Sequence, residues 1–195
     1  RQRQMCIRDS IHDVFVEKLV AATAELKMGN GLDEGVQQGP LVNEKAVEDV
    51  DRLVRLSTDA GAQVALGGAR SDLGPCYYQP TVLTGVTSDM AVFRNEIFGP
   101  VAPVMSFADE AEAIALANDT EFGLASYFYT RDIGRVWRVS EALDYGMVGV
   151  NEGIISNEMA PFGGVKASGS GREGSKYGID DYLELKYILM GGLDR

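Results

Sequence analysis

The sequence has too few histidines and cysteines for most metal centres or for a disulfide-stabilised fold. Its one histidine, His12, excludes a multi-histidine metal site and leaves a Ser/His/Asp mechanism dependent on a single residue. Its two cysteines, Cys6 and Cys76, cannot form a disulfide framework, so a reducing setting is the simplest one. We therefore expect a cytoplasmic protein with no metal ligands.

Long apolar runs and an excess of positive charge are also missing. No run approaches the roughly 18 apolar residues of a membrane span, and no apolar core of a signal peptide follows the N-terminus. The formal net charge is −11, which disfavours nucleic acid and anionic membrane surfaces as partners. Hydrophobic residues make up 45% of the 195 positions, which is enough to bury a core, and length alone favours one domain.

The first ten residues differ in character from the rest. The segment RQRQMCIRDS has three arginines and no apolar period, and the chain begins at Arg1 rather than at methionine. It resembles a translated cloning adapter, so we expect residues 1–10 to be non-native and to lie outside the fold. We also expect the chain to be a piece of a longer protein.

The remaining sequence alternates between helical and strand patterns. Apolar residues spaced for one helical face predict four helices, over about residues 10–28, 43–60, 109–118 and 133–143. Short apolar runs between turn residues predict strands at 63–68, 77–83, 100–107, 124–130, 147–151 and 182–190. This alternation predicts an α/β domain with a mostly parallel sheet flanked by helices.

Two of the predicted helices have an assigned inner face. The first is expected to begin with a capping box from Ser10 to Asp13. Its expected inner face comprises Ile11, Val14, Phe15, Leu19, Ala22 and Leu26. The expected inner face of the second comprises Ala46, Val47, Val50, Leu53 and Val54.

Near the C-terminus, GSGREG (Gly169 to Gly174) fits the G-x-G-x-x-G dinucleotide fingerprint. A working fingerprint follows a strand, opens a helix and has an acidic residue about 20 positions further on. Here the preceding PFGGVKAS is no hydrophobic strand, and the chain ends at residue 195, too soon for a second strand. We therefore interpret these glycines as permitting tight turns and close backbone approach.

Several motifs together resemble the aldehyde dehydrogenase superfamily. The segments PFGGVKASGSGREGSKYG (161–178) and RNEIFGPVAPV (94–104) are similar to its C-terminal signatures. QGPLVNEKA, YYQPTVL and ANDTEFGLASYFYTRD are similar to it in the same order. NEGIISNEMAPFGG and the C-terminal REGSKYGIDDYLELKYILMGGL resemble succinate-semialdehyde dehydrogenases in particular. The resemblance runs from Ile11 to Leu193.

The resemblance implies a fold and a reaction. In the family, a cysteine thiolate attacks an aldehyde to form a thiohemiacetal, hydride passes to NAD or NADP, and water activated by a glutamate hydrolyses the thioester. It implies a partial catalytic domain over residues 11–181 and an oligomerisation strand with a tail over 182–195. Because the nucleophile, the general base and the dinucleotide domain would lie upstream, we expect no catalytic residue here and no activity from the chain alone.

The resemblance assigns two cofactor-binding residues. Glu96, in the E-x-F-G-P motif, would accept hydrogen bonds from the nicotinamide ribose hydroxyls, and Phe98 would pack against the nicotinamide. A carboxylate suits a diol because its two oxygens can accept both protons. The alternative is a surface glutamate before a Gly-Pro turn, with Phe98 in the core. NAD and NADP stay equally open.

Two further residues would bind the substrate. Ser156, before the P-F-G-G motif, would hydrogen-bond the distal carboxylate of a semialdehyde, a role that Asn157 could share. Phe162 would line the aldehyde pocket. The alternatives are a solvated turn serine and an ordinary core phenylalanine. The substrate could also be glutarate semialdehyde or a broader range of aldehydes.

Other polar residues are not assigned to the chemistry. Only four residues separate Cys6 from the helix near Ile11, which is too few for the family's nucleophile, although QMC echoes its G-Q-x-C motif. Cys76 and His12 are expected to be structural, and Lys166, Arg172 and Glu173 to form a local ion-pair network. A second hypothesis is that the chain acts only in subunit association, through the 182–190 strand pairing with another copy as a homo-oligomer.

Overall fold

The structure, a computed structural model, describes residues 4–194 and divides into two compact units. Unit 1 is Arg1–Asp119 and unit 2 is Thr120–Arg195. Helices and strands alternate in each unit, so the predicted α/β class is confirmed.

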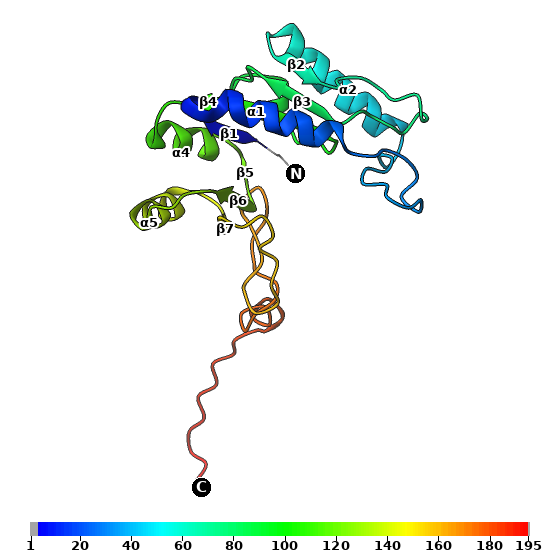
Figure 1. Ribbon diagram of the computed structural model, residues 1–195. Coiled ribbons are helices and arrows are strands. Elements are labelled where there is room, and N and C mark those ends of the chain that lie inside the picture. Colours follow the sequence, from blue (N-terminus) through cyan, green and yellow to red (C-terminus); the bar gives the residue numbers. More distant parts are fainter. Residues whose placement is uncertain (1–3, 195) are drawn as a thin grey trace. The chain divides into compact units, whose positions relative to one another are not determined.

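Unit 1 is built on a four-stranded sheet in the order β1-β4-β3-β2 (Figure 1). Strands β1 (Met5–Arg8), β4 (Val101–Phe107) and β3 (Thr81–Thr84) run parallel to one another, and β2 (Gln63–Leu66) is antiparallel to β3. The two central strands are near-continuous apolar runs and mostly buried, as strands covered on both faces require. The edge strand β2 is mostly exposed.

Four helices accompany this sheet. They are α1 (Asp9–Ala24), α2 (Glu44–Asp59), α3 (Ala91–Arg94) and α4 (Glu110–Asn118). Figure 1 shows α1 lying across the strands, and it contacts all four of them. The single-turn helix α3 packs against α2, and α4 contacts β1.

Helix α2 carries much of the core of unit 1. Its predicted inner face is confirmed for Val47, Val50, Leu53 and Val54, which are all nearly or fully buried. At its start, the side chain of Asn43 accepts a hydrogen bond from the Ala46 amide at 2.9 Å, which satisfies one of the free helical N–H groups.

Unit 2 contains two small sheets. Strand β6 (Ala125–Phe128) runs parallel to β7 (Met147–Val150), and α5 (Ile133–Ala142) connects them. Strand β5 (Phe122–Gly123) is antiparallel to β8 (Val165–Lys166). The buried apolar residues of unit 2 include Val139, within α5, and Leu143, directly after that helix.

The expectation that residues 1–10 lie outside the fold is wrong for the described part of that segment. Met5–Arg8 forms β1 and pairs in register with Val104 to Phe107. The reason is that β4 presents an unpaired backbone edge on that side, and four extended residues are enough to satisfy it. The predicted capping box is also wrong, because α1 begins at Asp9 after Arg8, with no side-chain cap, and Ser10 lies within the helix.

The predicted inner face of α1 is only partly correct. Phe15 and Leu19 are half-buried, but Ile11 and Val14 are each 57% exposed. Val16 and Val20, which were not expected to face inward, are half-buried as well. Apolar residues extend around more than one face of this helix, so the pattern did not fix which stripe meets the sheet.

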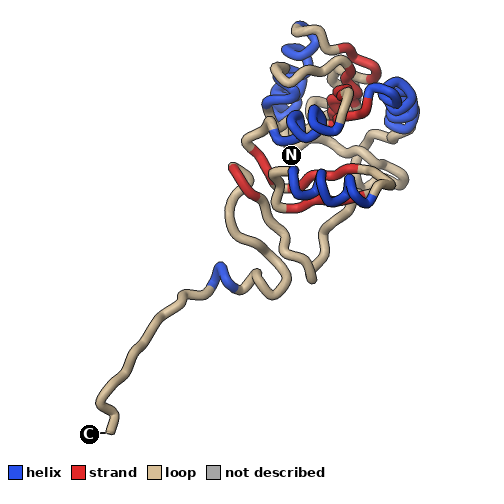
Figure 2. Tube along the Cα trace, turned by 90° about the vertical axis from the view of Figure 1, so that its left-hand side faces the viewer, coloured by secondary structure: helices blue, strands red, loops and turns tan. Residues whose placement is uncertain are grey.

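The predicted strand over 182–190 is wrong in the single chain. Tyr182 ends a short 3₁₀ turn (η1, Asp180–Tyr182), and Figure 2 shows residues 183–190 as loop. Leu185 is fully exposed and Tyr187 is 85% exposed. A strand needs a backbone partner, and within the described residues of this chain none pairs with the tail.

Candidate functional site

The loop from Arg94 to Gly99 is firmly anchored at the helix before it. In α3, Val92 and Phe93 are each 1% exposed. The Val92 amide donates to the buried Ser57 hydroxyl oxygen of α2 at 3.1 Å. The short helix therefore starts the loop from a fixed position in the core.

Within this loop, Glu96 and Phe98 flank a buried residue. Ile97 is 5% exposed, Glu96 is half-buried, and Phe98 is 67% exposed. The alternative that Phe98 is a core residue is therefore wrong for this structure. The backbone of Phe98 has φ 46°, a left-handed conformation that is costly for a residue with a Cβ atom. A large apolar side chain held outward by a strained backbone is typical of a ligand-binding position.

Gly99 fixes the turn that follows. A Cβ atom at this position would lie 2.5 Å from Cγ2 of Val50, which is fully buried in α2. The Val101 amide closes the turn by donating to the Gly99 carbonyl at 2.9 Å. The loop can approach α2 this closely only because residue 99 has no side chain.

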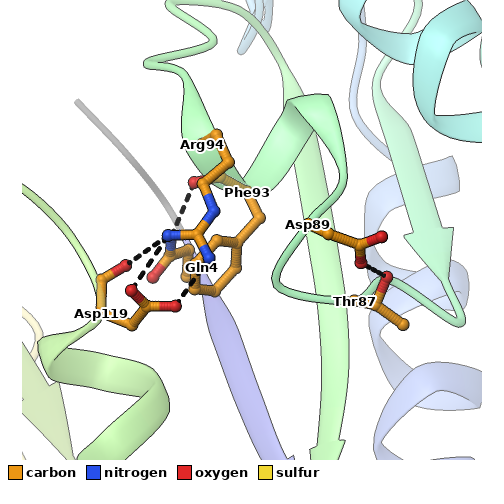
Figure 3. A network of polar contacts seen from close by, with 6 residues as sticks. All are labelled: Gln4, Thr87, Asp89, Phe93, Arg94 and Asp119. Atoms are coloured by element: carbon orange, nitrogen blue, oxygen red, sulfur yellow. Dashed lines mark hydrogen bonds and ion pairs between the residues drawn. The ribbon is translucent and has the colours of Figure 1, made fainter.

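An ion pair that sequence reasoning missed ties the start of this loop to the end of α4 (Figure 3). Arg94 donates from Nη1 to Oδ1 of Asp119 at 3.0 Å and from Nη2 to Oδ2 at 2.8 Å. Its hydrogen bond with Arg94 holds the pKa of the Asp119 carboxyl below its usual range. The partners are 25 positions apart, and no sequence spacing indicated that they would meet.

The same view shows a second polar contact in the turn before α3. The Thr87 hydroxyl donates to Oδ1 of Asp89 at 2.5 Å, and this bond lowers the pKa of the Asp89 carboxyl (Figure 3). Because Asp89 directly precedes Met90, the N-cap of α3, the contact orders the entry to the short helix.

In unit 2, the loop after β7 carries Ser156 and Asn157. It begins at Asn151, whose side chain accepts from the Thr130 amide at 2.9 Å and donates to the Thr130 carbonyl at 2.7 Å. Ser156 is exposed, as a substrate contact requires before binding. The Asn157 side-chain oxygen accepts from the Met159 amide at 2.8 Å, so that acceptor already serves the loop turn.

Phe162 lies where this loop meets the glycine-rich segment. Its amide donates to the Glu173 carbonyl at 2.9 Å, and the Glu173 amide donates back at 2.7 Å. The Ser175 amide also donates to the Glu158 carbonyl at 2.9 Å. The half-buried Phe162 is thus fixed by pairing with the segment that contains GSGREG.

The interpretation of GSGREG as a turn-forming segment is confirmed. Gly169, Gly171 and Gly174 all have positive φ, at 107°, 85° and 65°. The segment opens no α-helix, and at Gly171 a Cβ atom would lie 2.4 Å from a side-chain oxygen of Asp181. The glycines therefore allow close packing and left-handed turns, as the fingerprint's missing context had indicated.

The expected network of Lys166, Arg172 and Glu173 takes a different form. The Arg172 guanidinium donates to the carbonyls of Gly164 and Gly171, both at 2.7 Å. Lys166 pairs with Asp144 at 3.6 Å. Arg172 therefore holds the glycine loop through its backbone, because the carbonyls of the tight turns are nearer than any carboxylate.

The structure places Cys6 in β1 and His12 in the first turns of α1, which follows β1 directly. Cys6 lies in β1, where burial, and secondarily Glu112, raise the pKa of its thiol to about 11, which disfavours the nucleophilic thiolate. His12 contacts Asp13 at 3.0 Å on the surface of α1. Among residues 4–194, no group of three or more His, Cys, Asp or Glu side chains could hold a metal ion. Over the same residues, no helix has the length and apolar character to cross a membrane.

Comparison with known proteins assigns the family. A family model described as "Aldehyde dehydrogenase family" matches residues 2–188, and the chain belongs to this family. The chain is 55% identical to "Succinate-semialdehyde dehydrogenase [NADP(+)] GabD" of Escherichia coli K12 over 188 residues, and 56% identical to "Glutarate-semialdehyde dehydrogenase" of Pseudomonas aeruginosa over 190. These alignments cover 96% and 97% of this chain but 39% of each relative.

Solved structures agree with this assignment. The structure of a succinate-semialdehyde dehydrogenase from Burkholderia pseudomallei superposes with a TM-score of 0.93 at 55% identity. The superposed region makes up 95% of this chain and 39% of the chain of that structure. The fold is therefore that of an aldehyde dehydrogenase, and the chain spans well under half the length of these relatives. The family match also begins at residue 2, within the segment expected to be foreign.

Proposed function

We propose that this chain supplies the cofactor-facing and substrate-facing loops of an NAD(P)-dependent aldehyde dehydrogenase. The observation that carries the proposal is the Arg94–Gly99 loop, which holds a half-buried carboxylate at Glu96 beside a strained, outward-facing Phe98. A nicotinamide cofactor has a diol and a flat ring close together, and these two side chains offer a matching acceptor and apolar surface. A bound nicotinamide cofactor would supply the hydride acceptor for aldehyde oxidation.

The roles of the chain's own residues follow from their chemistry. The two Glu96 oxygens would accept hydrogen bonds from the ribose hydroxyls and so orient the nicotinamide end. Phe98 would cover one side of the ring and keep water from it. Both NAD and NADP are compatible with these contacts, because neither residue would touch the adenosine ribose.

We propose an aldehyde with a distal anionic group as the substrate, with succinate semialdehyde first. Relatives of 55–57% identity are named for succinate semialdehyde, glutarate semialdehyde and 3-sulfolactaldehyde, all of which carry an acid group. The exposed hydroxyl of Ser156 can donate to such a group, and Phe162 can pack against the carbon chain. Glutarate semialdehyde remains the alternative.

The proposal also covers what the chain does alone. We propose that the catalytic thiolate and the general base belong to upstream sequence, so the 195-residue chain produces no NAD(P)H from succinate semialdehyde. The raised thiol pKa of Cys6 supports this. Two unpaired cysteines support a cytoplasmic setting.

A chimera tests the function. Residues 9–193 of this chain would replace the matching segment of the Escherichia coli relative, whose own upstream part supplies the missing groups. We expect NADPH formation with succinate semialdehyde. In the chimera, Glu96→Ala should lower kcat/KM for the cofactor by about 10- to 100-fold, since hydrogen bonds to a charged group are lost. A folded chimera without turnover, or an unchanged Glu96→Ala variant, would contradict the proposal.

A second function, subunit association, is favoured by the exposed tail. Its apolar side chains are more than half exposed along 182–190: Tyr182, Leu183, Leu185, Tyr187, Ile188, Leu189 and Met190. An extended apolar segment with free backbone groups can add a strand to the sheet of another copy. Light scattering should show self-association of the chain that is lost when residues 183–195 are deleted. A monomer before deletion would exclude this role.

A further inference from the structure

Arg94 stands two residues before Glu96 and is held from several sides (Figure 3). Besides its two bonds to the Asp119 carboxylate, Nη1 also lies 3.4 Å from the Asp119 carbonyl oxygen. The centre of the guanidinium lies 5.0 Å from the centroid of the Phe93 ring, which is buried. Gln4 donates to the Phe93 carbonyl at 2.9 Å. The planar, forked Arg94 side chain is thus set in one orientation.

This orientation matters because the elements around Glu96 are fixed unequally. After Glu96, Ile97 is buried and Gly99 lies tightly against Val50. Before it, the buried Val92 and Phe93 are followed by two exposed residues, Arg94 and Asn95. Helix α3 has only four residues, too few for its last turn to be stable through its own hydrogen bonds. The ion pair of Arg94 with Asp119 joins the end of α3 to the C-cap residue of a longer helix, α4.

We propose that Arg94 is a positioning residue for Glu96. Through Asp119 it fixes the backbone on the N-terminal side of the carboxylate, so that Glu96 meets the cofactor ribose already oriented. This role rests on the proposed cofactor function of Glu96. Arg94 itself touches neither the cofactor nor the substrate.

Hydrogen exchange on the 195-residue chain tests the positioning directly, without any cofactor. Arg94→Gln and Asp119→Asn should each raise the exchange rate of the 95–99 segment by about two- to fivefold, the range expected for loss of a half-exposed ion pair. The double variant should add nothing further, because either change removes the same pair. Arg52→Gln is the matched control, since Arg52 pairs with Asp49 at 3.5 Å on the surface of α2. Unchanged exchange in Arg94→Gln, or equal changes in the control, would overturn the proposal.

The chimera separates positioning from general structural damage. Arg94→Gln should raise KM for the cofactor about two- to fivefold and leave KM for the aldehyde unchanged. Arg94→Lys keeps the charge but loses the fork, so it should restore only part of the effect. Equal changes in both KM values would overturn the inference. If Glu96→Ala leaves the chimera unaffected while Arg94→Gln still loosens the 95–99 segment, the proposed function fails and not the ion-pair geometry.

Discussion

The left-handed backbone of Phe98 makes an unusual prediction about stability. At an ordinary position, glycine is less stable than alanine by about 0.5–1 kcal/mol, because it loses more backbone entropy on folding. At φ 46° a residue with a Cβ atom loses roughly 1–2 kcal/mol that glycine does not. The two effects oppose each other, and the difference favours Phe98→Gly over Phe98→Ala by about 0.5–1 kcal/mol. Both variants lose the same aromatic ring, so the comparison isolates the backbone.

Urea denaturation followed by circular dichroism measures this difference. With a slope of about 2 kcal/mol/M, the midpoint of Phe98→Gly should lie roughly 0.3–0.5 M above that of Phe98→Ala. The control is Glu48, which is exposed in the middle of α2, where alanine should be more stable than glycine by about 1 kcal/mol. If alanine were also the more stable residue at position 98, the claim that this turn stores strain would be refuted.

Three further outcomes follow from burial and packing in the described residues. Leu83→Ala, at a fully buried position, should lower the free energy of unfolding by about 2–5 kcal/mol. Leu185→Ala, at a fully exposed position, should change it by less than about 0.5 kcal/mol. Equal effects of the two variants in urea titrations would contradict the assigned core. Gly99→Ala should lower the free energy of unfolding by about 1–3 kcal/mol, because its Cβ atom would clash with Val50. Adding Val50→Ala to this variant should recover part of the loss. Strictly additive losses would argue against the close approach of Gly99 to Val50. Native Cys6 should react with iodoacetamide at pH 8 about 100-fold more slowly than in urea, because the pKa of its thiol is about 11 in the folded chain against 9.0 in the unfolded one. Since the folded thiol holds its proton more tightly, its contribution to stability is present below pH 9 and is lost between pH 9 and 11. Fast alkylation of Cys6 in the native chain would contradict its burial.

Local patterns predicted most helices and central strands because each depends on nearby residues. The inner face of α2 follows from helical spacing alone, and Val47, Val50, Leu53 and Val54 are buried as expected. The pattern was less decisive for α1, whose apolar residues occupy more than one face. The tail was misassigned because an alternating pattern specifies a strand only when another backbone is present to pair with it.

The candidate site likewise has features that the sequence predicted and features that it did not. Glu96 and Phe98 are two residues apart, so a single motif placed them on one loop, and the pairing of Phe162 with Glu173 explains how the glycine segment supports a second loop. The non-native origin expected for residues 1–10 and the domain boundary expected at residue 181 stay predictions, as do the roles of Ser156 and Phe162 in binding substrate.

By itself, the sequence determined the family, the α/β class and the residue types at the two loops, because these depend on motifs and on short-range periodicity. Only the tertiary structure decided that Phe98 faces outward on a strained backbone, that Gly99 must lack a side chain beside Val50, and that Arg94 meets Asp119. The last two depend on segments distant in sequence being brought within a few ångströms. Such contacts are set by how helices and strands pack, and the local pattern of residues does not encode them.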